Sequence, residues 1–371
     1  MNRFTHFLFL LFLVPTTMMA QGQLLKQHHI TTFRTEQFDS ILTAQHVPKR
    51  LAPIRYDVAI YAVEYATRWH DGSAVMASGI VMLPLEAKAA APILAYAHGT
   101  RVRKNRPFTM LGEETLGAFY ATDGYAVVMP DFLGLGTGEK RHLYHHAKSE
   151  ATCVVDMIKA SKQLFKEQGI EVSGQLFLTG YSQGGHVAMA SHRYIQNHAE
   201  QTGMKVAASV PMSGAYDLAG VQGELMFEPY EYSGYLPYLL YSFQEVYHLA
   251  PDTTYILQKR YHEAIMPLFD GGHKLSEISR LLPEIPAEAL RPELLEAFLA
   301  NPEHPMRKVM EENSVIDWVP EAPVLMCYCK GDEQVNYRNA KVAEKTMKSL
   351  GAKNVKAKMA GRRYKHCLLY T

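Results

Sequence analysis

A short segment near the middle of the chain has the residue types of an activated serine nucleophile, Gly180-Tyr181-Ser182-Gln183-Gly184. The strand-like run Leu176–Thr179 comes directly before it, and a helix-like run that begins at Gly185 follows it. A sharp strand–turn–helix junction of this kind strains the serine backbone and exposes its Oγ above a sheet. Residues two before and two after the serine must be small, because strand and helix pass close together there, and Gly180 and Gly184 satisfy this condition. The setting therefore predicts that Ser182 is a nucleophile.

Two residues that could activate this serine follow it in the chain. A serine hydroxyl reacts poorly unless a base, usually a histidine held by a carboxylate, takes its proton. In folds with such an elbow the acid comes after the serine and the histidine comes last. Asp332 follows the strand-like run 324–329, and His366 is the single histidine beyond it. We therefore predict Asp332 as the orienting acid and His366 as the general base.

Other titratable residues fit these roles less well. Glu333, beside Asp332, is the alternative acid, and Asp131, at the end of another strand-like run, is a more distant candidate. Five further histidines lie upstream of the serine or in its helix, and as bases they would break the expected order. They are His98, His142, His145, His146 and His186.

Two pairs of adjacent histidines, His28-His29 and His145-His146, have ligand types that metals use. Neither pair has carboxylates at ligand spacing in the sequence. We interpret both pairs as loop histidines and predict neither a metal ion nor an organic cofactor.

Acyl transfer also requires N–H donors for the negative charge that develops on the carbonyl oxygen. The N–H of the residue after the nucleophile, Gln183, is the expected first donor. A second donor is expected from the loop after the third strand, and here the run 92–97 continues into His98-Gly99-Thr100. Because Gly99 lets the backbone turn toward the site, we predict the Thr100 N–H as the second donor, with Arg101 as the alternative.

The elements that must position these residues alternate along the chain beyond residue 50. Helical patterns near 114–122, 147–167, 184–200 and 337–349 separate short apolar runs. This alternation indicates a mostly parallel sheet covered on both faces, and the hairpin signal Asp71-Gly72 indicates antiparallel strands at one edge. The predicted class is α/β with an eight-stranded sheet, its strands at 56–63, 74–82, 92–97, 125–129, 176–179, 206–212, 324–329 and 355–359.

Residues 221–320 interrupt this alternation and contain no convincing strand. Eight tyrosines lie between Tyr230 and Tyr261, and an apolar helical face runs from Leu236 to Tyr247. Five prolines divide the remainder into short helices. We interpret 221–320 as a helical cap over the carboxyl edge of the sheet. An ordinary helical subdomain without a role at the site is the alternative.

The N-terminus has the pattern of a secretory signal peptide. Arg3 precedes the apolar run Phe7–Val14, and Met18-Met19-Ala20 follows a break at Pro15, so we predict cleavage after Ala20. The apolar run is too short for a permanent membrane-spanning helix. We expect a secreted or periplasmic protein with no transmembrane segment after cleavage.

Composition narrows the possible partners. The 371 residues include 38 Lys+Arg and 37 Asp+Glu, and 47% are hydrophobic, which excludes a disordered chain. Loss of Arg3 with the signal peptide leaves the mature chain formally neutral. A neutral chain lacks the basic face that nucleic-acid binding requires, and it offers no steering for a charged substrate.

Four cysteines, Cys153, Cys327, Cys329 and Cys367, are too few for a disulfide scaffold. We expect buried free thiols. A bridge from Cys327 or Cys329 to Cys367 is the alternative.

Together these motifs resemble the α/β-hydrolase superfamily, over residues 50–371. Within it the chain is most similar to secreted lipases and esterases with a helical insertion after the sixth strand. The resemblance implies a serine esterase that acts through an acyl-enzyme on a small ester or lipid. The predicted organisation is a signal peptide at 1–20, a hydrolase core at 21–220 and 321–371, and the cap at 221–320. The motifs that carry the resemblance are His98-Gly99-Thr100, Pro130–Gly136, Gly180–His186, Gly331–Val335 and His366.

Two other functions are compatible with this fold, since one fold carries many activities. A serine peptidase of the aminopeptidase kind would use the same triad, although residues 1–53 cannot house a large N-terminal propeller. A non-catalytic binding protein is disfavoured, because a strained elbow serves no packing purpose. Neither the acyl and alcohol preference nor the oligomeric state follows from the sequence.

Overall fold

The computed structural model describes residues 19–44, 53–104, 108–109 and 112–366. The predicted signal peptide therefore lies outside the described residues except for Met19 and Ala20, and Cys367 lies outside them as well.

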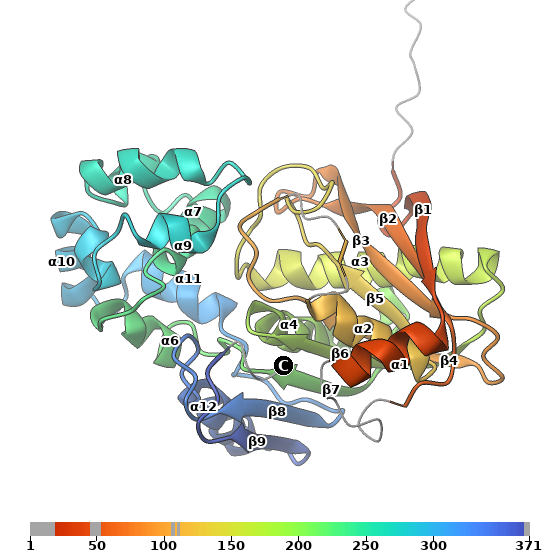
Figure 1. The fold of residues 1–371 in the computed structure, drawn as a ribbon. Coiled ribbons are helices and arrows are strands. Elements are labelled where there is room, and N and C mark those ends of the chain that lie inside the picture. The colour runs from red at the N-terminus through yellow and green to blue at the C-terminus, as the bar shows by residue number, and fades with distance from the viewer. Residues whose placement is uncertain (1–18, 45–52, 105–107, 110–111, 367–371) are drawn as a thin grey trace, which may run out of the picture.

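A nine-stranded sheet forms the centre of the molecule (Figure 1), with the strand order β1-β2-β3-β5-β4-β6-β7-β8-β9. Neighbours from β5 through β4 to β9 are parallel, and those from β1 to β5 are antiparallel. The predicted mostly parallel α/β class with an antiparallel edge is thus confirmed. The strands are β1 (Leu24–Phe33), β2 (Val58–Arg68), β3 (Ala74–Pro84), β4 (Ala91–Ala97), β5 (Ala126–Pro130), β6 (Val172–Tyr181), β7 (Val206–Met212), β8 (Val324–Cys329) and β9 (Val355–Gly361).

The ninth strand is the N-terminal β1, which the apolar pattern did not indicate. Its residues Lys26, Gln27, His28 and His29 are exposed. An edge strand needs no burial on both faces, so it can form without an apolar run. By contrast, all five residues of the central strand β5 are buried.

Helices cover both faces of this sheet, and the alternation of side chains along the strands shows it. Val63, Val81 and Val128 pack with residues of α3 and α4, whereas Ile60, Met82 and Val127 pack with residues of α1 and α2. On each strand the residue of the first set is an odd number of positions from the residue of the second set. The two sets therefore point to opposite faces of the sheet. The helices of the core are α1 (Thr35–Ala44), α2 (Glu113–Thr122), α3 (Ala147–Glu167), α4 (Gln183–Asn197), α5 (Ala199–Thr202) and α12 (Arg338–Ser349).

Between β7 and β8 the chain forms short helices that gather beside the sheet, at the end toward which β7 and β8 point (Figure 1). Leu240 and Phe243 of α7 are buried in an apolar cluster with Ile278 and Phe298 of later helices. No helix among the described residues is long and apolar enough to cross a membrane. The elements of this segment are α6 (Val221–Glu224), η2 (Leu225–Phe227), α7 (Tyr235–Tyr247), η3 (Thr253–Tyr255), α8 (Lys259–Ile265), η4 (Met266–Leu268), α9 (Leu275–Ser279), η5 (Pro286–Ala289), α10 (Pro292–Ala300) and α11 (Pro305–Asn313).

Candidate active site

Ser182 occupies the turn between β6 and α4 with φ 57° and ψ −120°, a strained conformation for a residue with a side chain. Its N–H donates to the Met212 carbonyl at 2.9 Å, which ties the turn to the end of β7. A Cβ at Gly184 would overlap the carbonyl of Ala97, and a Cβ at Gly180 would overlap the carbonyl of Gly184. Both positions therefore require glycine, as the sequence predicted for a sharp elbow.

The structure brings Asp332 and His366 together. The Asp332 carboxylate oxygens lie 2.8 and 2.9 Å from His366 Nδ1, and both side chains are buried. Asp332 Oδ1 also accepts the N–H groups of Gln334 and Val335, which fixes the carboxylate. Because Nδ1 donates to the carboxylate, Nε2 keeps the lone pair that can take a proton.

His366 lies beside the elbow, because its ring centroid is 4.9 Å from that of Tyr181, the residue before Ser182. Ser182 Oγ and the imidazole of His366, both within the described part of the chain, form no direct hydrogen bond. Such bonds are often long before substrate binds and shorten in the complex.

The two alternative acids have other partners. Glu333 Oε2 accepts the backbone N–H of His366 at 3.1 Å, so Glu333 holds the histidine's main chain. Asp131 accepts from Ser78 at 2.8 Å and faces the Arg101 guanidinium at 3.6 Å, and burial raises the pKa of its carboxyl. Of the three carboxylates, it is Asp332 that pairs with the imidazole of His366.

The loop after β4 lies next to the serine. A Cβ on Gly99 would be 3.6 Å from the Ser182 Cβ, and the Gly99 N–H donates to Glu113 at 3.0 Å. Thr100 follows, with its hydroxyl 3.1 Å from the Tyr144 hydroxyl. Gln183 is the first residue of α4, where a backbone N–H has no acceptor within the helix. Arg101, the alternative donor, uses its guanidinium to bind Glu114 at 2.8 Å.

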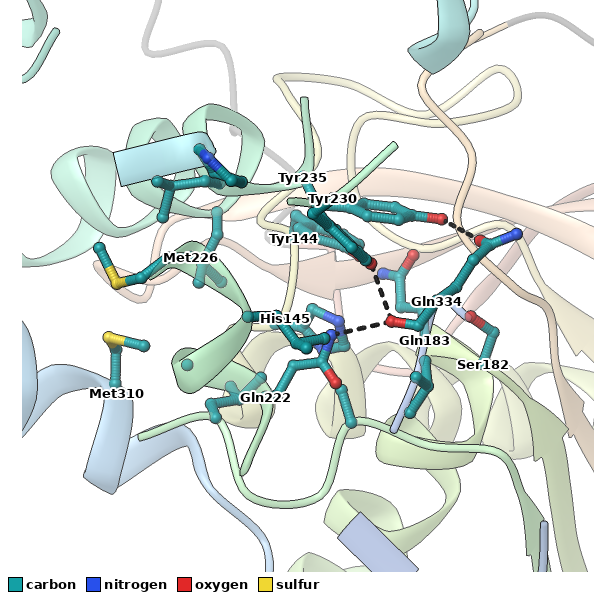
Figure 2. Close-up of a pocket in the computed structure, with 18 residues that line it drawn as sticks. Tyr144, His145, Ser182, Gln183, Gln222, Met226, Tyr230, Tyr235, Met310 and Gln334 are labelled. Carbon is teal, nitrogen blue, oxygen red and sulfur yellow. Dashed lines mark hydrogen bonds between the residues drawn. The ribbon is translucent and has the colours of Figure 1, made fainter. Parts of the chain in front are cut away.

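A cavity of about 70 Å³ opens at Ser182 and Gln183 and extends into the predicted cap at 221–320, as Figure 2 shows. Tyr230 and Tyr235 of the cap donate hydrogen bonds to Gln334, at 2.8 Å to its carbonyl and 2.9 Å to its side chain. Gln334 belongs to the loop that carries Asp332, so these bonds join the cap to the site. Sequence reasoning missed Gln334, although its place two residues after Asp332 was a usable signal.

A second feature that the sequence did not indicate is a buried polar network behind Gln183. The side-chain amide of Gln183 lies 2.6 Å from His142 Nε2 and also donates to Glu150. The Leu133 carbonyl is 3.1 Å from His142 Nδ1, so Nδ1 carries the proton and Nε2 accepts from the amide. Burial lowers the pKa of His142, which favours the neutral ring.

His145 and His146 lie in the loop before α3, as predicted, but a carboxylate that the sequence spacing did not indicate lies near His145. His145, Glu150 and His186 are all buried, and one ligating atom from each lies within 4.8 Å of the others. His186 Nε2 lies 2.8 Å from the Asn313 carbonyl, and its Nδ1 is 3.4 Å from Glu150 Oε2. By residue type this group could hold a divalent cation.

The other histidine pair lies in a strand, and three of the cysteines are free. His28 and His29 lie in strand β1 rather than in a loop. Cys153, Cys327 and Cys329 are free thiols, and burial raises the pKa of each.

Residues 112–366 match the family model described as Secretory lipase. No protein of curated function matches the sequence.

Three solved structures show the same fold. The rice cell wall degrading esterase LipA from Xanthomonas oryzae is 26% identical over 92% of both chains, with a TM-score of 0.83. A putative hydrolase from Legionella pneumophila is 27% identical over 93% of both chains, with a TM-score of 0.83. Candida antarctica lipase A, at 16% identity and a TM-score of 0.69, covers 94% of this chain and is itself covered to 78%, and it supports the fold alone. The chain therefore belongs to the secretory lipase family and is a carboxylic-ester hydrolase with an α/β-hydrolase fold.

Proposed function

We propose that this enzyme is a secreted serine esterase that cleaves carboxylic esters through an acyl-enzyme on Ser182, with Asp332 and His366 completing the triad. The observation that supports it best is the pairing of a strained Ser182 with an Asp332–His366 hydrogen bond of 2.8 Å beside it.

In the first half-reaction His366 Nε2 takes the proton of Ser182 Oγ as Oγ attacks the ester carbonyl. The negative charge on the carbonyl oxygen is stabilised by the N–H groups of Gln183 and Thr100. His366 then gives its proton to the leaving alcohol. A water molecule attacks the acyl-enzyme by the same sequence of proton transfers, which releases the acid and restores Ser182.

The expected substrate is uncharged near the reacting carbon. The cavity at Ser182 is lined mainly by apolar side chains and tyrosines, and among the described residues no Lys, Arg, Asp or Glu lines it. The predicted signal peptide at 1–20 and the family both support export of the protein. The segment 221–320 acts as a cap on a core formed by 21–220 and 321–371.

A fluorophosphonate probe tests the nucleophile. We expect labelling at Ser182, and we expect Ser182→Ala to abolish labelling and to lower p-nitrophenyl butyrate hydrolysis by about three orders of magnitude or more. Ser191→Ala, at a buried serine of α4, the helix that follows Ser182, is the matched control and should keep its activity. Labelling of another serine, or undiminished turnover by Ser182→Ala, would refute the assignment. Faster cleavage of aminoacyl amides than of esters would favour a peptidase instead.

A further inference from the structure

The cavity at Ser182 ends at two methionines. Met226 of η2 and Met310 of α11 line the end away from Ser182, as Figure 2 shows. Both are buried, with 5% and 3% of their surface exposed, inside the apolar cluster of the cap. A chain that enters from Ser182 therefore meets their side chains as the end wall.

The size of the cavity limits what it can hold. Its volume is about 70 Å³. This is smaller than the cavity of roughly 150 Å³ that holds a benzene ring. The cavity therefore suits a short acyl chain, and the chain of a long fatty acid does not fit.

Several contacts hold the walls in place. Tyr230, Tyr235 and Gln222 donate hydrogen bonds to Gln334 on the loop of Asp332. A Cβ at Gly223 would lie 3.1 Å from the Met310 Cε and 2.7 Å from the Leu218 carbonyl, so the backbone packs closely against the methionine. The methionine therefore has little room to withdraw on that side.

The part of the substrate that stays on the enzyme is the part that this cavity suits. After acylation the alcohol must leave, whereas the acyl group remains bonded to Ser182 until water attacks. An apolar cavity that begins at Ser182 and ends at Met226 and Met310 fits the retained group, and the departing alcohol needs a path to solvent.

We propose that this cavity is the acyl site, that it restricts the enzyme to esters of short acyl chains of about two to six carbons, and that Met226 and Met310 set this limit. The proposal rests on the proposed function, because it requires acylation of Ser182.

The test is a series of p-nitrophenyl esters from acetate to palmitate, assayed with wild-type enzyme, Met226→Ala and Met310→Ala. Wild type should be most efficient with two to six carbons and lose at least about tenfold in kcat/KM by ten carbons. Each variant should move the optimum to longer chains, because removing a methionine side chain lengthens the cavity. Met359→Ala, a methionine 42% exposed on β9, is the matched control and should keep the wild-type profile.

If Met310→Ala fails to fold, Met310→Val retains more of the packing and should show a smaller shift in the same direction. Acetate esters of longer alcohols should be tolerated by the wild type. Highest efficiency with laurate or palmitate, unchanged profiles in both folded variants, or a chain-length limit on the alcohol instead would overturn the proposal. Failure of the proposed function would look different, since no ester would be cleaved and Ser182 would not react with the fluorophosphonate.

Discussion

The carboxyl edge of the sheet, where Ser182 and Asp332 lie, and the cap are built in different ways, although both face the same cavity. We call this carboxyl edge the sheet edge. At the sheet edge, main-chain geometry fixes the groups: Ser182 is strained between β6 and α4, and Asp332 accepts two backbone N–H groups. In the cap, contacts between side chains fix the groups that line the cavity. Examples are the stack of Tyr238 on Phe269 and the hydrogen bond from Tyr235 to Gln334. Backbone constraints leave little tolerance for substitution, whereas side-chain packing can be repacked at moderate cost. We therefore expect substitutions at the sheet edge to be severe and those in the cap to be mild.

The largest effect is expected from Asp332→Asn. The amide cannot hold His366 in the tautomer whose Nε2 accepts a proton, so kcat/KM should fall by about 10³–10⁴-fold while the protein stays folded. Steady-state kinetics with a butyrate ester, alongside circular dichroism, measures both. Glu333→Gln is the matched control, because the Glu333 carboxylate accepts the backbone N–H of His366 whereas Asp332 pairs with its imidazole. This substitution should lower kcat/KM by less than about tenfold. A greater loss in Glu333→Gln than in Asp332→Asn would make Glu333 the acid.

Gly184→Ala should be the next most damaging change. The new methyl group would overlap the carbonyl of Ala97 and lie close to that of His98, both of them main-chain atoms that cannot move aside cheaply. We expect a loss of about 3 kcal/mol or more in the free energy of unfolding, measured by urea titration. Gly272→Ala in the cap is the control, because its Cβ would meet only the flexible side chain of Asp270, at 3.2 Å. Equal losses at the two positions would remove the contrast between sheet edge and cap.

Acid should destabilise the sheet half through buried histidines. Burial lowers the pKa of His192 in α4 from 6.5 to about 4, so the unfolded chain takes up a proton before the folded one does. This contribution to stability is present above pH 6.5 and is lost as the pH falls from 6.5 to about 4, by about 3 kcal/mol. His192→Gln should flatten thermal unfolding profiles between pH 4 and 7, and His273→Gln at an exposed site in the cap should not. An unchanged profile in His192→Gln would contradict the assignment.

The smallest effect is expected from Tyr235→Phe in the cap. It removes the hydrogen bond to Gln334 Oε1 at 2.9 Å and keeps the ring that stacks on Tyr144. We expect a loss of about 1 kcal/mol in the free energy of unfolding and a decrease in kcat/KM of only a few fold. Tyr255→Phe, on a ring that is 47% exposed, provides the baseline. A loss as large as that of Asp332→Asn would show that the cap takes part directly in catalysis.

Much of the fold could be predicted because its strands are continuous apolar runs. The eight runs found in the sequence all form strands of the sheet, and the segment 221–320 is helical between β7 and β8. Strand β1 was missed because an edge strand can be polar and still pair with β2. Single-sequence patterns report burial, and a strand that is mostly exposed leaves no such pattern.

The candidate site divides in the same way. Chain order and strand ends, which are local properties, led to Ser182, Asp332 and His366, and the last two are in contact in the structure. Nothing local connects Glu150 to Gln183, or Tyr235 to Gln334, because these pairs are 33 and 99 residues apart. Contacts of that kind exist only after the helices have packed.

The sequence by itself therefore determined the class of fold, the strained elbow and the order of the acid and the histidine, because each depends on residue types within a few positions of one another. The tertiary structure alone decided the depth of the cavity, its end at Met226 and Met310, and the burial of His145, Glu150 and His186 together. These properties arise where distant segments meet, and burial there depends on what every neighbouring element contributes.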